Sequence, residues 1–476
     1  MLAQFVLYIQ NYRRRRMKLQ WASIKDWVEN YTQGAKPEDL LTELLSDFDA
    51  QDTAWITLAT PLLLKKQLEV LKTLPAGGPG QPSTPLWGVP FAVKDNIDVA
   101  GWPTTAACPA FSHRPTKTAS VVESLQKAGA ILVGKTNMDQ FATGLVGTRS
   151  PYGPVPNSFN PQYISGGSSS GSAVVVARGL VPFSLGTDTA GSGRIPAAFG
   201  NIVGLKPTRG AISTWGVLPA CRSLDCVSIF ALSTHEARLI YSLTESPDSR
   251  DPYNRTRPKE FSPFPQQPSE IRLGYPAQLR PECDDETQNL FKESLKKWAN
   301  LGFSLVPVDF SPLHELAALL YQGPWVAERY VAIKDFFDSH NKKMDPIVAG
   351  ILGQGKQWSA ADFFQAEYRR KEILQTLLPL WLRVNALLMP TAPSIFTLLE
   401  VSQEPLQRNS DLGVYTNFMN LADLCALAIP GGFRQNGLPQ GLTLAAPAWQ
   451  EEILWNLGEI GKNLSPGEPG NQSVKW

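Results

Sequence analysis

Two short glycine-rich segments that carry serine lie close together near the middle of this 476-residue chain. Residues 166–172 read Gly-Gly-Ser-Ser-Ser-Gly-Ser, and residues 186–193 read Gly-Thr-Asp-Thr-Ala-Gly-Ser-Gly. Glycine permits positive φ, so several backbone N–H groups can converge in such segments. The small apolar residues 173–177 follow at once, which favours a tight turn before a buried helix over a flexible linker. No Gly-Lys-Ser/Thr follows, which argues against a phosphate-binding loop.

Lys94 provides a third chemical group. It follows the apolar residues 91–93 at the expected end of a strand and precedes Asp95. Burial would lower the pKa of this lysine, because desolvation disfavours the charged form. A neutral amine could then accept a proton from a serine. When Lys94 is considered without the other motifs, a solvated lysine or one paired with Asp95 is the better interpretation.

The two turns and Lys94 together offer what amide hydrolysis requires. Ser192 and Ser168 supply a nucleophile and a relay hydroxyl, and Lys94 supplies a base. The second turn consists of small residues, so an oxyanion could approach its backbone N–H groups to about 3 Å. An ordinary glycine-rich turn is the alternative for this segment. The expected oxyanion donors are Thr189, Ala190, Gly191 and Ser192.

Composition excludes several other classes of function. The net charge is +1, so nothing suggests nucleic acid or an anionic membrane as a partner. The five cysteines are scattered without a CxxC pair, so we expect no zinc site and no disulfide framework. No motif indicates a metal or an organic cofactor. The four histidines lie outside any GxSxG or HExxH motif, which disfavours a Ser-His-Asp hydrolase.

Residues 1–17 are too short and polar to span a bilayer, and their charges follow the apolar stretch, unlike a signal peptide. For these residues, an extension ahead of a start at Met17 is favoured over the alternative of a mitochondrial-type presequence. The scattered cysteines fit reduced thiols, so we expect a cytoplasmic protein.

Hydrophobic periodicity predicts an α/β fold with an N-terminal helical segment. Short apolar runs predict strands that end at Val93 and cover 131–133. Helical spacing covers much of residues 21–74, and Gly129 marks the end of another helix, 120–128. Further helices are expected at 313–320, 324–336, 360–383 and 418–427.

The stretch from Gly166 to Thr208, which ends Arg-Ile-Pro-Ala-Ala-Phe-Gly-Asn-Ile-Val-Gly-Leu-Lys-Pro-Thr, closely resembles the signature of the amidase signature family. The resemblance implies a central mixed β-sheet flanked by helices and a Ser-cisSer-Lys triad. Ser192 would be the nucleophile, Ser168 the relay serine after a cis peptide bond, and Lys94 the general base. It also implies an amidase domain at 18–460, with a disordered extension at 1–17 and a tail at 461–476 without a second C-terminal domain.

Within that family, four segments of this chain resemble the allophanate hydrolases in particular: residues 94–101, 142–153, 223–228 and 320–330. The resemblance implies hydrolysis of allophanate with release of ammonia, the second step of biotin-dependent urea degradation. It also implies a homodimer with a functional link to a biotin-dependent urea carboxylase. The substrate-binding residues would be Tyr321, Arg329, Gly144 and Ser169.

The substrate assignment has alternatives. Arg329 could instead lie on a helix surface, paired with Glu328 or Asp335. The chain could then be a broad aliphatic amidase or the glutaminase subunit of a tRNA-dependent amidotransferase. A catalytically silent binding protein on the same fold is a third interpretation, which the intact Lys94, Ser168 and Ser192 disfavour.

Overall fold

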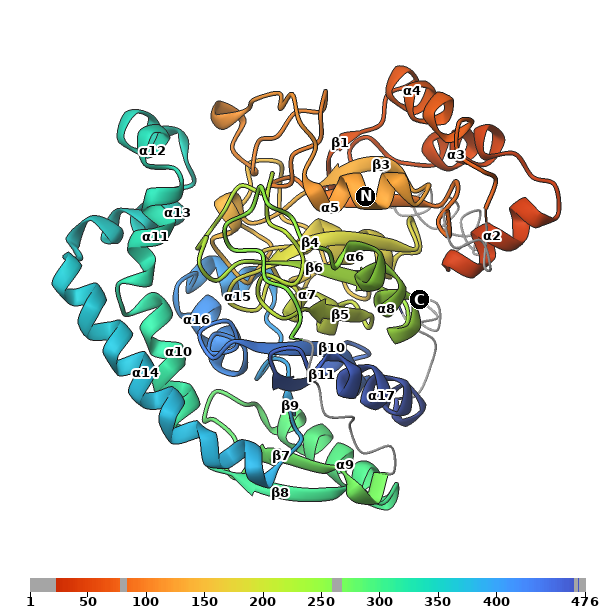
Figure 1. Ribbon diagram of the computed structural model, residues 1–476. Helices are drawn as coiled ribbons and strands as arrows, with labels where there is room; N and C mark the ends of the chain where they lie inside the picture. The colour runs from red at the N-terminus through yellow and green to blue at the C-terminus, as the bar shows by residue number, and fades with distance from the viewer. Residues whose placement is uncertain (1–22, 78–83, 259–267, 466–469, 471–476) are drawn as a thin grey trace.

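The computed structural model describes residues 23–77, 84–258, 268–465 and 470, whose strands form one mixed sheet of eleven (Figure 1). The strand order is β1-β3-β2-β4-β6-β5-β10-β11-β9-β7-β8. β2 runs parallel to β3 and β4, β7 runs parallel to β8 and β9, and the other neighbours are antiparallel. The strands are β1 Trp55–Leu58, β2 Pro90–Lys94, β3 Ile131–Thr136, β4 Phe183–Asp188, β5 Val203–Lys206, β6 Cys226–Ala231, β7 Arg272–Pro276, β8 Ser304–Val308, β9 Ala386–Pro390, β10 Leu424–Phe433 and β11 Pro439–Pro447.

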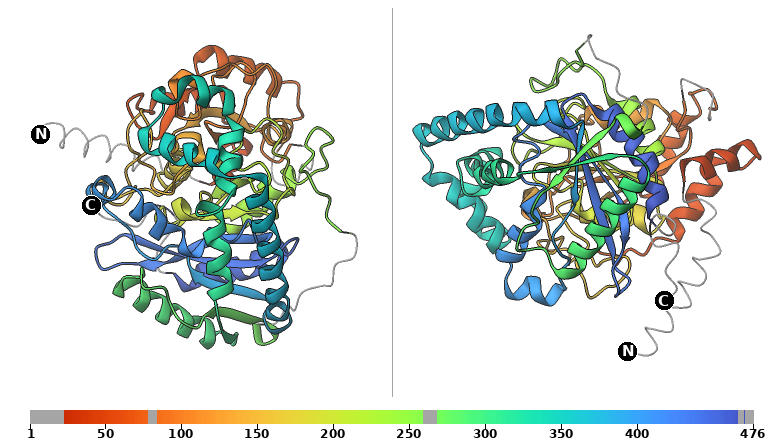
Figure 2. Two further views of the ribbon diagram at one scale, coloured as in Figure 1. Left: turned by 90° about the vertical axis from the view of Figure 1, so that its left-hand side faces the viewer. Right: turned by 90° about the horizontal axis from the view of Figure 1, so that it is seen from below.

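Helices flank this sheet, and α10 to α14 form an outer arc along one side, at the left of Figure 1 and along the upper left edge of the view from below in Figure 2. The helices are α2 Ile24–Thr32, α3 Pro37–Ser46, α4 Pro61–Leu71, α5 Ser120–Lys127, α6 Ser170–Ala177, α7 Ile195–Phe199, α8 Thr234–Thr244, α9 Asp285–Asn300, α10 Ser311–Tyr321, α11 Trp325–Ala332, α12 Lys334–His340, α13 Pro346–Gly353, α14 Ala360–Arg383, α15 Leu398–Gln403, α16 Gln407–Leu412 and α17 Glu451–Gly461. None of these helices is long and apolar enough to cross a bilayer.

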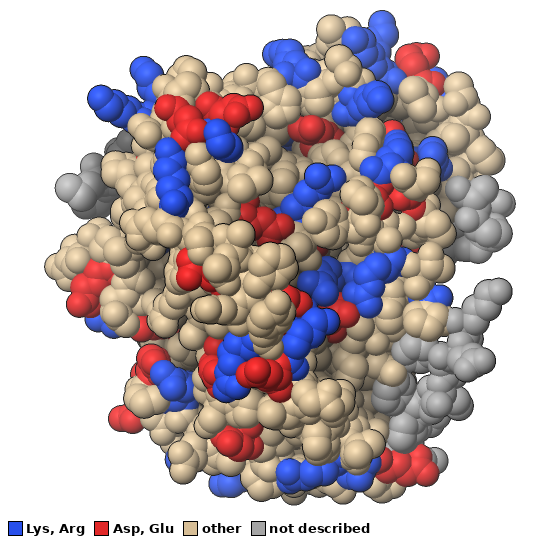
Figure 3. Space-filling model, turned by 60° about the vertical axis from the view of Figure 1, so that its left-hand side comes forward, with Lys and Arg blue, Asp and Glu red and all other residues tan. Residues whose placement is uncertain are grey.

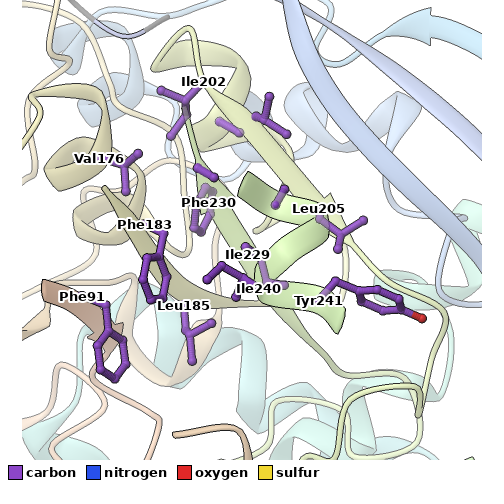
Figure 4. Close-up of a cluster of buried hydrophobic side chains, with 14 of the residues drawn as sticks. Phe91, Val176, Phe183, Leu185, Ile202, Leu205, Ile229, Phe230, Ile240 and Tyr241 are labelled. Carbon is purple, nitrogen blue, oxygen red and sulfur yellow. The ribbon is translucent and has the colours of Figure 1, made fainter. Parts of the chain in front are cut away.

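The centre of the sheet is buried on both faces, which explains its continuous apolar strands. Every residue of β2 and β4 is buried, and the rings of Phe91 and Phe183 stack with their centroids 5.4 Å apart. Val176 on α6 and Ile240 on α8 belong to the same cluster (Figure 4). This rigid centre fixes both the end of β2 and the start of α6.

Several predicted elements are confirmed, and three predictions are corrected. Helix α5 ends as expected before Gly129, whose φ of +94° suits glycine. The predicted helix 418–427 is wrong: residues 418–423 form turns, and residues 424–427 begin β10. A central strand buried on both faces has no alternating pattern, so its apolar run is easily read as a helix. The predicted helix 324–336 is broken at Ile333 into α11 and α12. The N-terminal helical segment exists, but β1 interrupts it.

Ser23 caps the first described helix, α2, and Glu236 of α8 accepts the N–H of Ile24. These contacts join the N-terminal helical segment to the core. The predicted extension, residues 1–17, lies outside the described residues, as does most of the predicted tail beyond Ser465.

Candidate active site

Lys94, Ser168 and Ser192 form a continuous hydrogen-bonded chain. Lys94 is the last residue of β2, Ser168 lies in the turn before α6, and Ser192 lies in the turn after β4. The Lys94 Nζ donates to Ser168 Oγ over 2.7 Å, and Ser168 Oγ donates to Ser192 Oγ over 2.9 Å. All three side chains are buried. The two glycine-rich turns and the strand end therefore meet at one point, as the sequence predicts.

The surroundings of Lys94 favour its neutral amine, which can act as a base. Burial lowers its pKa to about 7, although the carboxylates of Asp139, Asp225 and Asp188 act in the opposite direction. The Nζ also donates to Thr187 Oγ1 over 2.8 Å, which fixes its position. In the protonated state the donors run from Lys94 to Ser168 to Ser192. Loss of a proton from Lys94 allows the direction to reverse, so that Ser192 donates toward the amine.

A buried ion pair holds the turn that carries Ser192. The guanidinium of Arg194 contacts both oxygens of Asp188 at 2.8 and 2.9 Å, and both side chains are fully buried. Asp188 also accepts the N–H of Gly193 at 2.9 Å. Within the described residues, the N–H groups of Ala190, Gly191 and Ser192 donate to no protein acceptor. They remain available to an oxyanion at the expected place.

The peptide bond between Gly167 and Ser168 is cis, as the resemblance implies. Asp139 Oδ2 packs against Gly167 so closely that a Cβ there would lie 2.1 Å from it. The same carboxylate accepts the N–H groups of Val146 and Gly147. Asp139 thus joins the turn of Ser168 to the loop at residues 142–149.

Arg329 and Tyr321 lie together at the other side of this loop. Tyr321 ends α10, and Arg329 lies inside α11. The Arg329 Nη2 donates to Tyr321 Oη over 3.2 Å, and Nη1 donates to Ala142 O and Thr143 Oγ1. Arg329 is 2% exposed, its Nε has no partner, and no carboxylate lies within ion-pair distance among the described residues.

Glu328 forms hydrogen bonds with Ser223 rather than an ion pair with its neighbour Arg329. It accepts the N–H and the hydroxyl of Ser223, both at 2.7 Å. Arg329 is buried and forms an ion pair with neither acid among the described residues, so the alternative of a surface arginine paired with Glu328 or Asp335 is wrong. Glu328 instead ties α11 to the segment that leads to Asp225.

The remaining predicted site residues line the same region. Thr189 donates through its hydroxyl to Asp225. The hydroxyl of Ser169 donates to Thr187 O over 3.1 Å. A Cβ at Gly144 would lie 2.6 Å from Asp139 Oδ2, so this position needs glycine.

The sequence patterns did not single out three residues that support this site: Asp139, Asp225 and Arg149. Asp225 is buried and accepts Thr189 Oγ1, and burial raises its pKa to about 6. Arg149 is buried and donates to Thr143 O over 3.0 Å. Asp225 and Arg149 each lie inside a segment that resembles the allophanate hydrolases, residues 223–228 and 142–153, and this is the signal that could have singled them out.

Among the described residues, no group of histidine, cysteine or acidic side chains is arranged to hold a metal ion. All five cysteines are buried and free.

The amidase family model matches residues 40–455, which is most of the chain. The chain belongs to the amidase signature family. It is 47% identical to the urea amidolyase of Saccharomyces cerevisiae over 93% of its length, but it spans only 24% of that relative. The structure of Kluyveromyces lactis allophanate hydrolase has a TM-score of 0.90 and 44% identity, over 95% of this chain and 75% of that one. A glutamyl-tRNA(Gln) amidotransferase subunit from Methylacidiphilum infernorum is 33% identical, over 79% of this chain and 82% of its own.

Proposed function

We propose that this chain hydrolyses the terminal amide of allophanate, urea-1-carboxylate, and releases ammonia. The observation that carries the proposal is the buried guanidinium of Arg329, which lacks a carboxylate partner among the described residues. A buried cation without a protein anion is costly, so an anionic substrate is its natural partner. Arginine matches a carboxylate with a planar fork, and the Tyr321 hydroxyl adds a donor. The similarity to urea amidolyase and allophanate hydrolase supports the same substrate.

The proposed mechanism follows the hydrogen-bonded chain. Neutral Lys94 takes the proton of Ser168 while Ser168 takes that of Ser192, and Ser192 Oγ attacks the amide carbon. The backbone N–H groups of residues 189–192 would stabilise the oxyanion. Lys94 returns the proton through Ser168 to the leaving nitrogen, and the C–N bond breaks to give ammonia and an acyl-enzyme. Water then cleaves the ester and restores Ser192, releasing N-carboxycarbamate.

The other residues of the site have supporting roles in this proposal. Arg329 and Tyr321 hold the carboxylate, and the backbone at Gly144 and Ser169 lies against the small planar substrate. Asp139 and Arg149 support the loop between them through the contacts at Gly147 and Thr143.

The experiment is to measure ammonia release from allophanate, malonamate, glutamine and a neutral aliphatic amide by the purified chain. Malonamate keeps the carboxylate and the amide but replaces the central nitrogen with carbon. We expect kcat/KM for the two small anions to exceed that for the neutral amide by about 10- to 100-fold, the worth of a charge-assisted hydrogen bond. Activity only on the neutral amide, or only on glutamine, would be consistent with the serine mechanism but would contradict allophanate as the substrate.

We further infer that the amidase domain spans residues 18–460, which the family match to 40–455 and the end of α17 at Gly461 support. From the family resemblance we infer a cytoplasmic homodimer that works with a biotin-dependent urea carboxylase. The similarity to urea amidolyases supports the link to urea degradation.

A further inference from the structure

The loop at residues 220–225 joins two parts of the candidate site. On one side, Glu328 of α11 accepts the N–H and the hydroxyl of Ser223, each over 2.7 Å. On the other side, Asp225 accepts the hydroxyl of Thr189, the first residue of the turn that would hold the oxyanion. Asp225 also accepts two N–H groups of its own loop, over 2.8 and 3.1 Å. This bridging loop therefore connects α11 to the oxyanion turn through hydrogen bonds on both sides.

Further contacts hold the bridging loop between these two parts. The side-chain amide of Asn420 donates to Leu224 O over 2.9 Å and to Asp188 O over 2.8 Å, so one group fixes the loop against the end of β4. Arg209 donates to Ser223 O over 2.9 Å. Both Leu224 and Asn420 are buried. Buried contacts of this kind leave the loop little freedom, so a displacement of α11 is passed on to the oxyanion turn.

Two neighbouring residues of α11 make these contacts and the contacts of the anion site. Arg329 donates to Tyr321 and to Ala142 O, whereas Glu328 accepts from Ser223. Adjacent positions of a helix do not face each other, so one turn of α11 serves both purposes without an ion pair between the two side chains. The helix that would hold the substrate anion is thus the helix that anchors the bridging loop.

Charges of both signs are mixed on the surface over this part of the molecule. On the side that Figure 3 brings forward, which carries the arc of α10 to α14, acidic and basic side chains lie next to one another. The pair of Arg369 with Glu315 is one example. Opposite charges at such short spacing largely cancel at a distance, and salt screens what remains. The position of an anionic substrate therefore depends on the buried contacts.

We propose that Glu328 is a positioning residue for the reaction. Acting through Ser223 and Asp225, it fixes the distance between the anion-binding side of α11 and the oxyanion turn. The proposal rests on the proposed function, in which Arg329 holds the carboxylate of a small planar substrate while its amide lies at Ser192. Such a substrate spans both points and has no flexible part to absorb a change in their spacing. An error of about 1 Å in the position of a reacting atom can cost ~10²-fold in rate.

The first test separates turnover from binding. Glu328→Ala removes the acceptor of both Ser223 groups and leaves Arg329 in place. We expect kcat for malonamate to fall about 10- to 100-fold, because its amide is misplaced. Inhibition by malonate, which has carboxylates but no amide, should change by less than about threefold, as should kcat/KM for a neutral aliphatic amide, which Arg329 does not hold. Equal losses on the two amides, or an unchanged kcat for malonamate, would overturn the positioning role.

Graded variants and a matched control accompany this test. Glu328→Gln keeps one acceptor oxygen, and Ser223→Ala keeps the N–H, so both should retain a kcat for malonamate between that of Glu328→Ala and that of the unaltered chain. The control is Glu315→Ala, which breaks a contact between α10 and α14 in the same arc and should leave kcat for malonamate unchanged. A loss as large in Glu315→Ala would mean that any weakening of the arc slows the reaction. Circular dichroism confirms that each variant is folded.

A double-mutant cycle tests the connection through the bridging loop. Glu328 and Thr189 make no hydrogen bond with each other, and the effects of independent sites add. Thr189→Val removes the hydroxyl that Asp225 accepts. If the loop transmits the position of α11, the double variant should lose little more kcat for malonamate than Glu328→Ala alone, whereas fully additive losses would overturn the proposal. Failure of the proposed function is seen separately, in the unaltered chain, as the absence of any preference for malonamate over the neutral amide, and this proposal would then be wrong as well.

Discussion

Lys94 Nζ lies 2.7 Å from Ser168 Oγ although 74 positions separate the two residues along the chain. The strand end places the amine, and the turn before α6 places the hydroxyl. Ser168 then contacts Ser192, so any proton that leaves Ser192 for the amine passes through one intermediate oxygen. This arrangement makes the three side chains act as a unit, and removal of any one should disable the others.

Loss of the nucleophile or the base should stop turnover. We expect Ser192→Ala to lower kcat by at least ~10⁴-fold, because the nucleophile is lost. Lys94→Met should lower kcat by about 10²- to 10⁴-fold, because general-base catalysis contributes on that scale. The measurement is ammonia release by purified variants with unchanged circular dichroism. Lys72→Met, which alters an exposed lysine, is the control and should keep full activity. Wild-type turnover by Ser192→Ala would remove the triad from the mechanism.

The pH dependence should follow Lys94. Burial lowers the pKa of this amine to about 7, so the active neutral form is lost as the pH falls below that value. We expect kcat/KM to rise with pH between about 6 and 8 and then to level off, with one ionisation near 7. A pH profile with a neutral amide isolates this step from the binding of a carboxylate. A flat profile across that range would show that no group with this pKa acts in the reaction.

The sequence predicted the three catalytic candidates because their motifs occur together and resemble the amidase signature, although each motif alone has an ordinary structural explanation. No comparable motif marks the supporting acids Asp139 and Asp225. Asp139 and Asp225 act on these motifs only through contacts that the fold creates, such as Asp139 against Gly167. Strand β10 was missed for a similar reason, since it lies in the sheet beside β5, which is distant in the sequence.

The carboxylate selectivity should depend on Arg329. In the proposed site, Arg329→Ala removes the partner of the substrate anion, so KM for malonamate should rise about 10- to 100-fold and KM for a neutral amide much less. The measurement is the ratio of kcat/KM for the two substrates in the same preparation.

Two further variants separate charge from structure at this position. Arg329→Lys keeps the charge without the planar fork, so its KM for malonamate should lie between that of the unaltered enzyme and that of Arg329→Ala. Tyr321→Phe removes one hydroxyl and should produce a smaller loss of the same kind. If Arg329→Ala impairs both substrates equally, the arginine supports the fold rather than the anion.

The ion pair between Arg194 and Asp188 should dominate the stability of the nucleophile turn. Although burial acts to raise the pKa of Asp188, Arg194 holds it below its usual range. Arg194→Met would leave this carboxylate buried without its cation and should lower the free energy of unfolding by about 3–5 kcal/mol. Urea denaturation followed by tryptophan fluorescence measures the change. The matched control is Arg238→Met, which breaks a surface pair with Glu452 that is half exposed on both sides and should cost at most about 1 kcal/mol. Equal losses for the two variants would mean that the buried pair contributes no more than a solvated one.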